Sequence, residues 1–185
     1  MGEQHKKHSR REHLNDFHLN VAGEYVYDGA LYACQSSDAK QRRSKRAVWG
    51  MAAILTVAVA AGGCIPAPGM QNCFYVLLPY LGEFLGAASV IWALAKLGMD
   101  WGTVREYNYK KSVAVLPVRT AVTAVFSGLG IVCELIFFFV NDHAGQTFFA
   151  LLYVLLKLTA LLSALVLRAE IMQAEWDKLP KKDNS

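Results

Sequence analysis

The stretch that decides the fold is Leu116–Val140, which reads LPVRTAVTAVFSGLGIVCELIFFFV. Its charged residues are Arg119, near the start, and Glu134, inside the apolar run. About 20 helical residues cross the ~30 Å hydrocarbon core of a bilayer, so this block is long enough to span one. A carboxylate within such a span costs about 3 kcal/mol, and Glu134 therefore requires either a partner or a function.

The rest of the chain repeats this pattern. Of 185 residues, 54% are hydrophobic, and they collect in long blocks rather than in short amphipathic runs. The blocks lack the alternation of barrel strands, and only helices or closed barrels satisfy their backbone in lipid. We therefore expect an all-α integral membrane protein, a four-transmembrane-helix bundle with spans at 47–63, 74–98, 116–140 and 147–167.

Lysine and arginine predict the orientation of this bundle. Neither residue occurs in the loops 64–73 and 141–146, whereas both occur before the first span, between the second and third, and after the fourth. Because positive residues are retained in the cytoplasm, we expect cytoplasmic N- and C-termini, with an arm at 1–46 and a helical tail at 168–185. The short loops favour a bacterial plasma membrane. The net charge of +4 then indicates contact with anionic lipid rather than with nucleic acid.

Within the arm, the segment 23–34, GEYVYDGALYAC, predicts a β-hairpin. Asp28 and Gly29 suit a two-residue turn, which would place Tyr25 opposite Tyr32. An isolated hairpin is marginal in water, so this one needs a surface. It could rest on lipid headgroups or on the bundle, or it could dock a partner.

Two cysteines, Cys64 and Cys73, bracket the first exported loop, CIPAPGMQNC. The prolines and the glycine argue against a helix between them. An oxidising compartment favours a disulfide that would pin the ends of the first two spans. A redox centre is the weaker alternative, because that chemistry uses a C-x-x-C pair and a second pair of cysteines.

The third and fourth spans each carry one buried charge. Glu134 lies about 10 Å below the outer end of its helix, and Lys157 about 15 Å below the outer end of the next helix, at 1.5 Å per residue. The short loop between them makes the two helices antiparallel neighbours. We therefore predict an intramembrane charge pair of Glu134 and Lys157, since pairing offsets much of the cost of burying each group.

Helical spacing also predicts which faces point inward. The third span has a polar stripe of small side chains at three- and four-residue intervals, formed by Thr120, Thr123, Ser127, Gly130 and Glu134. Glu83, in the second span, is a possible third member of the charge cluster. It is buried if the helix begins at Phe74, but lies one turn from a positive helix end if the helix begins at Pro79. Both interpretations of Glu83 stay open.

These features predict a small polytopic membrane protein that serves as an accessory or interaction subunit of a membrane complex. The expected partners are the lipid bilayer and either another membrane protein or a second copy of the chain. The alternative is an oligomeric channel or proton-coupled carrier that uses the intramembrane Glu and Lys residues. We predict no enzyme, cofactor or metal, because no ligand cluster, no nucleophile–base pair in a recognisable context and no phosphate-binding loop motif stands out. The irregularly spaced histidines of the arm, His5, His8, His13 and His18, favour a solvated tail.

Overall fold

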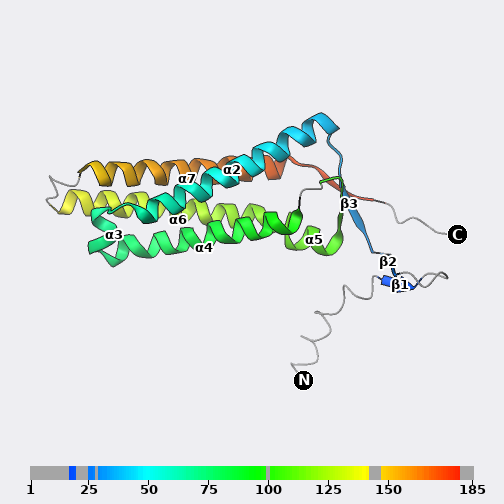
Figure 1. Ribbon diagram of the computed structural model, residues 1–185, viewed down its shortest axis with the longest axis horizontal. Coiled ribbons are helices and arrows are strands. Elements are labelled where there is room, and N and C mark those ends of the chain that lie inside the picture. The colour runs from blue at the N-terminus through cyan, green and yellow to red at the C-terminus, as the bar shows by residue number, and fades with distance from the viewer. Residues whose placement is uncertain (1–16, 20–24, 28, 99–100, 142–146, 180–185) are drawn as a thin grey trace, which may run out of the picture.

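The computed structural model describes residues 17–19, 25–27, 29–98, 101–141 and 147–179. Four long helices lie side by side in a bundle (Figure 1): α2 (Asp38–Cys64), α4 (Phe74–Leu97), α6 (Leu116–Val140) and α7 (Thr147–Gln173). Each is long and apolar enough to cross a membrane. The prediction of a helical bundle with four such spans is thereby confirmed.

The four helices form a ring. α6 packs against α4 on one side and α7 on the other, α7 packs in turn against α2, and a sparser contact between α2 and α4 closes the ring. Alanines from all four helices pack together with Leu55 and Val59 in one buried cluster. Such small side chains let helix backbones approach closely, which is how helices pack where lipid removes the hydrophobic driving force.

Two helix boundaries differ from the prediction by more than one residue. α2 begins at Asp38, nine residues before the predicted span at 47, because the basic run ahead of the apolar block consists largely of good helix formers. α7 ends at Gln173, and the chain then turns into the strand β5 (Trp176–Lys178). The predicted helical tail is therefore wrong over residues 174–179, and residues 180–185 of it lie outside the described residues.

A small sheet joins three segments that are far apart in the sequence. β3 (Leu31–Cys34) pairs antiparallel with β4 (Thr103–Arg105) on one side and with β5 on the other. The sheet lies at the end of the bundle where α2 begins and α7 ends (Figure 1). The tail, the middle loop and part of the arm therefore meet at one end of the bundle.

The predicted hairpin at 23–34 is wrong. β2 (Tyr25–Tyr27) pairs with β1 (Phe17–Leu19), which puts Tyr25 opposite Leu19 rather than opposite Tyr32. Tyr32 instead lies opposite Val104 and Lys178. β3 has strands on both edges, so it offers no free edge to β2. The predicted turn residue Asp28 lies outside the described residues.

The loop between α2 and α4 contains a short helix, α3 (Pro68–Asn72), at the opposite end of the bundle from the sheet (Figure 1). The expectation of a helix-free loop is wrong, because proline is compatible with the first position of a helix. The predicted disulfide is wrong too, since Cys64 and Cys73 are both free. Cys64 is exposed at the end of α2, whereas Cys73 packs against the apolar cluster under α3. A second short helix, α5 (Glu106–Lys111), precedes α6.

Candidate functional site

The buried charges form a polar cluster in the middle of the bundle. Lys157 of α7 is 2% exposed, Glu83 of α4 is fully buried, and the Lys157 ammonium forms an ion pair with Glu83 Oε2. Glu83 reaches this depth because α4 begins at Phe74 and continues through Pro79 as one helix. Of the two interpretations of Glu83, the structure selects the buried one.

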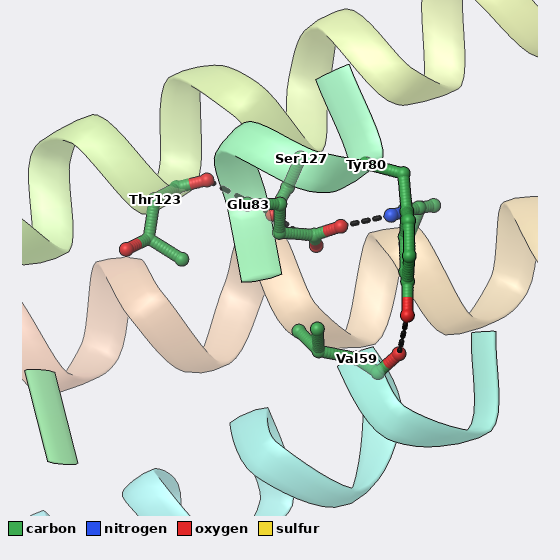
Figure 2. Close-up of polar contacts among 6 residues, drawn as sticks. Val59, Tyr80, Glu83, Thr123 and Ser127 are labelled. Carbon is green, nitrogen blue, oxygen red and sulfur yellow. Dashed lines mark hydrogen bonds and ion pairs between the residues drawn. The ribbon is translucent and has the colours of Figure 1, made fainter. Parts of the chain in front are cut away.

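The second oxygen of Glu83 is bound from α6. The Ser127 hydroxyl lies 2.6 Å from Glu83 Oε1 and 3.0 Å from the Thr123 carbonyl oxygen (Figure 2). A hydroxyl has one proton, and the shorter contact to a charged acceptor is the stronger bond. Ser127 therefore donates to Glu83, and both carboxylate oxygens have partners.

Two tyrosine rings enclose the ammonium group. Lys157 Nζ lies 4.6 Å from the ring centroid of Tyr80 and 5.0 Å from that of Tyr153, both within the range of a cation–π interaction. The Tyr80 hydroxyl in turn donates to the carbonyl oxygen of Val59 on α2, at 3.5 Å (Figure 2). The cluster therefore connects all four long helices.

Glycines make room for these contacts. A Cβ added at Gly82 would lie 2.5 Å from the Phe126 ring, and one at Gly86 would lie 2.6 Å from Thr123 Oγ1. Real Cβ atoms do not come this close, so the pair Gly82 and Gly86 allows α4 to lie directly on α6. Gly130 is not needed in the same way, because a Cβ there would make an ordinary van der Waals contact with the Lys157 stem at 3.5 Å.

The predicted pair of Glu134 and Lys157 is wrong. Glu134 is fully buried on α6, but the hydrogen bond recorded for its side chain is with the Gly69 backbone N–H of α3, at 3.4 Å from Oε1. The physical reason is that α3 folds over the C-terminal part of α6 and brings a first-turn amide to the carboxyl group. Lys157 meanwhile packs against Gly130, one turn nearer the middle of α6, where Glu83 reaches it.

Two buried polar atoms in this region have no partner among the described residues. They are Glu134 Oε2 and the Tyr153 hydroxyl. Burying an unpaired polar atom costs free energy, and an unpaired charge costs far more. Within the described residues, the Gly69 N–H is the one recorded donor that offsets the burial of the Glu134 carboxyl group.

The polar stripe of α6 lies on the buried face of that helix. Thr120, Thr123 and Ser127 are fully buried, as are Tyr153 and Lys157 on the facing side of α7. The two threonine hydroxyls donate to carbonyl oxygens one turn earlier in the same helix, Thr120 to Leu116 and Thr123 to Arg119. The hydrogen-bonding needs of these two hydroxyls are thus met within α6. Among Thr120, Thr123 and Ser127, only Ser127 has a recorded side-chain hydrogen bond to another helix.

Sequence reasoning missed two members of the cluster, Tyr80 and Gly69. Tyr80 had a usable signal, because it precedes Glu83 by three residues and shares a helix face with it. Gly69 had none, since its role depends on where α3 lies in the folded chain. Comparison with protein-family models, with curated proteins and with solved structures finds no match, so the function is argued from the residues themselves.

Proposed function

We propose that this chain is a small polytopic membrane protein that acts as an interaction subunit of a membrane complex, and that it binds a transmembrane helix of an unlike partner. The polar cluster supports this role, because the charges of Glu83 and Lys157 neutralise each other and are enclosed by protein. A pair satisfied in this way serves to fix the helices relative to one another. The bundle then acts as a rigid support for the surface that binds the partner.

The observation that carries the proposal is the outward face of α2. Gly50, Ala53 and Ala60 are exposed along one side of this helix, and no atom lies within 4 Å of a Cβ added at Gly50. Ile54 at 43% and Val57 at 67% exposure lie among these small residues of α2, whereas the outward faces of α4, α6 and α7 carry larger side chains, such as Phe84 at 49% and Trp92 at 63% exposure. Lipid fills spaces beside large and small residues alike, but close helix packing requires small ones.

The test is to enlarge this face. The triple substitution Gly50→Leu, Ala53→Leu and Ala60→Leu should abolish copurification of an unlike, stoichiometric partner from native membranes. Ala88→Leu, at an exposed position of α4, is the matched control and should retain the partner. A triple variant that still carries the partner, or a wild-type chain that purifies without one, would contradict the proposal.

We further propose that the sheet end of the bundle is cytoplasmic and that the host membrane is a bacterial plasma membrane. The sheet gathers segments of the three lysine- and arginine-containing regions at one end, and positive residues are retained in the cytoplasm. In a cysteine-free background, single cysteines at the exposed positions Ser37 and Thr103 should be protected from an impermeant thiol reagent in intact cells. One at Asn141 should react, and the reverse pattern would overturn the orientation.

A second candidate function is an oligomeric channel or proton-coupled carrier. The observation that favours it is the buried Oε2 of Glu134, which has no partner among the described residues. The Gly69 N–H occupies Oε1 alone, and intramembrane acids often serve proton paths. A homo-oligomer whose proton flux in liposomes disappears with Glu134→Gln would support this candidate over the first.

A further inference from the structure

An apolar groove of about 370 Å³ runs along the outward face of α6. Its α6 side chains recur at three- and four-residue intervals, so they lie on one face over the first three turns of the helix. They include Val118, Ala121, Val122, Val125 and Phe126. In the ring of four helices, α6 lies diagonally across from α2. The groove is therefore separate from the proposed interaction surface on α2, and none of these residues belongs to the polar cluster.

The groove has the depth of one membrane leaflet. The half-buried side chain of Ala121 lies between the larger, exposed Val118 and Val125 along the helix. Open space continues toward the middle of the bundle, because Gly128 follows Ala121 by two turns on the same face and a Cβ added there would have no atom within 4 Å. From Pro117 to Gly128 the helix rises about 16 Å, which is about half of the ~30 Å hydrocarbon core.

One charged side chain, Arg168 of α7, lines the groove, and the rest of the lining is apolar. Arg168 is half-buried, and within the described part of the chain no ion pair or hydrogen bond is recorded for its side chain. Its neighbour Leu167 belongs to the same buried cluster as Leu116, so Arg168 lies near the start of α6, at the sheet end of the bundle. It is also the first charged residue after the apolar block that ends at Leu167, which is where hydrocarbon gives way to headgroups.

We propose that this groove binds an anionic phospholipid of the leaflet at the sheet end, with one acyl chain along α6 and the phosphate on Arg168. Such a site presupposes the membrane insertion proposed above. The planar guanidinium matches phosphate oxygens bidentately, and the apolar lining matches a lipid tail. In the proposed orientation this leaflet is the cytoplasmic one, whose surface is negative.

A transmembrane helix of another protein is the alternative occupant of the groove. The side chains of the groove favour the lipid, because close packing of two helices requires small residues. The β-branched Val118, Val122 and Val125 are all exposed along this face and would hold a second helix away from α6. A flexible acyl chain, in contrast, fits between side chains of unequal size.

The experiment measures lipid binding to the purified full chain in neutral detergent. The probes are phosphatidylglycerol and phosphatidylcholine with identical chains, each with a photoactivatable diazirine in one acyl chain. Phosphatidylglycerol should bind saturably and about fivefold or more tightly than phosphatidylcholine, because the latter carries a cation beside its phosphate. On irradiation it should label the α6 segment 118–128. Equal affinity for the two lipids, or saturable labelling confined to other segments, would overturn the proposed site.

Matched charge variants separate this site from diffuse positive charge. Arg168→Gln should weaken phosphatidylglycerol binding by about fivefold or more, because it removes charge-assisted hydrogen bonds to the phosphate. Lys96→Gln removes the same charge from an exposed position near the end of α4, where the ammonium lies over the Trp92 ring, and should weaken binding by less than about twofold. Equal losses in the two variants would overturn the role of Arg168.

Matched size variants test the place of the acyl chain. Ala121→Phe keeps Arg168 but fills the groove, and should weaken phosphatidylglycerol binding by about threefold or more. The expected loss is small because lipid and detergent tails are equally apolar, so the preference for lipid comes from fit and charge. Ala88→Phe, at an exposed position of α4, should leave binding unchanged. Unaltered binding by a folded Ala121→Phe variant, or an equal loss in Ala88→Phe, would sink the acyl-chain site.

Native membranes distinguish the two occupants, and the two proposals from each other. A photoactivatable amino acid at position Val118 should crosslink to lipid, and a crosslink to another protein would overturn the lipid as occupant. The triple variant of the α2 face should lose the unlike partner and keep its preference for phosphatidylglycerol. Loss of the lipid preference with the partner retained would remove the lipid site and leave the interaction role intact. A wild-type chain that prefers phosphatidylglycerol but purifies without a partner would support the lipid site and contradict the interaction role.

Discussion

Replacing Lys157 by methionine would expose the role of the central ion pair. Lys157 is 2% exposed and Glu83 is fully buried, so neither group can turn to water when its partner is removed. Methionine keeps the unbranched stem that packs on Gly130 and removes only the ammonium group. Glu83 would then retain the Ser127 hydroxyl as its one recorded donor.

The expected magnitude follows from the burial of both groups. Removing one partner of a buried pair costs about 3–5 kcal/mol, because the other charge is left uncompensated or must become neutral. Glu83→Gln should cost a similar amount. Well-packed neutral replacements of whole buried pairs are often tolerated, so the double variant should lie within about 1 kcal/mol of the wild type. The cycle should therefore give a coupling free energy of at least about 3 kcal/mol.

The assay is reversible unfolding in mixed micelles, with the far-ultraviolet circular dichroism followed as the denaturing detergent is increased. A second cycle combines Lys157→Met with Glu134→Gln. Its coupling should stay below about 1 kcal/mol, since the recorded side-chain bond of Glu134 is with Gly69 rather than with Lys157. A larger coupling in the second cycle than in the first would refute the assignment of Glu83 as the partner.

Three further outcomes are expected from the packing. Gly86→Val should destabilise the bundle by about 2 kcal/mol or more in the same assay, because its side chain would overlap Thr123, whereas Gly128→Val, which has open space, should cost under about 1 kcal/mol. Cys64 and Cys73 should both react with a thiol reagent in denatured, unreduced protein, and a bonded pair found by mass spectrometry would contradict the structure. Ala33→Pro should detach the sheet, because proline is not tolerated in a central strand, and faster tryptic cleavage within β4 and β5 would report this.

The sequence by itself determined which segments form the bundle and which face of α6 points inward. The length of each apolar block specifies a span, because every backbone amide in lipid must bond within its own helix. The stripe that includes Thr120, Ser127 and Glu134 specifies a face, because side-chain direction repeats every 3.6 residues along one helix. Both properties belong to a single segment and need no knowledge of its neighbours.

Only the tertiary structure decided which acid partners Lys157. Depth along separate helices favoured Glu134 and left Glu83 as a possible third member, but the outcome depends on where α4 begins and how closely it lies on α6. Gly82 and Gly86 permit that approach. Glu134 instead accepts a hydrogen bond from the Gly69 backbone N–H of α3. Both contacts depend on how separate helices pack against each other, and the periodicity of a single helix does not predict that packing.

The same distinction explains the strands at the cytoplasmic end proposed above. Local turn chemistry favoured a hairpin through Gly29, but the stability of a short strand comes from the surface on which it packs. Tyr32 stacks on the Tyr109 ring at a centroid distance of 4.2 Å, and Tyr109 also contacts Trp176. These aromatic contacts join β3 to segments more than 70 residues away in the chain, and such long-range contacts are not part of a local turn preference.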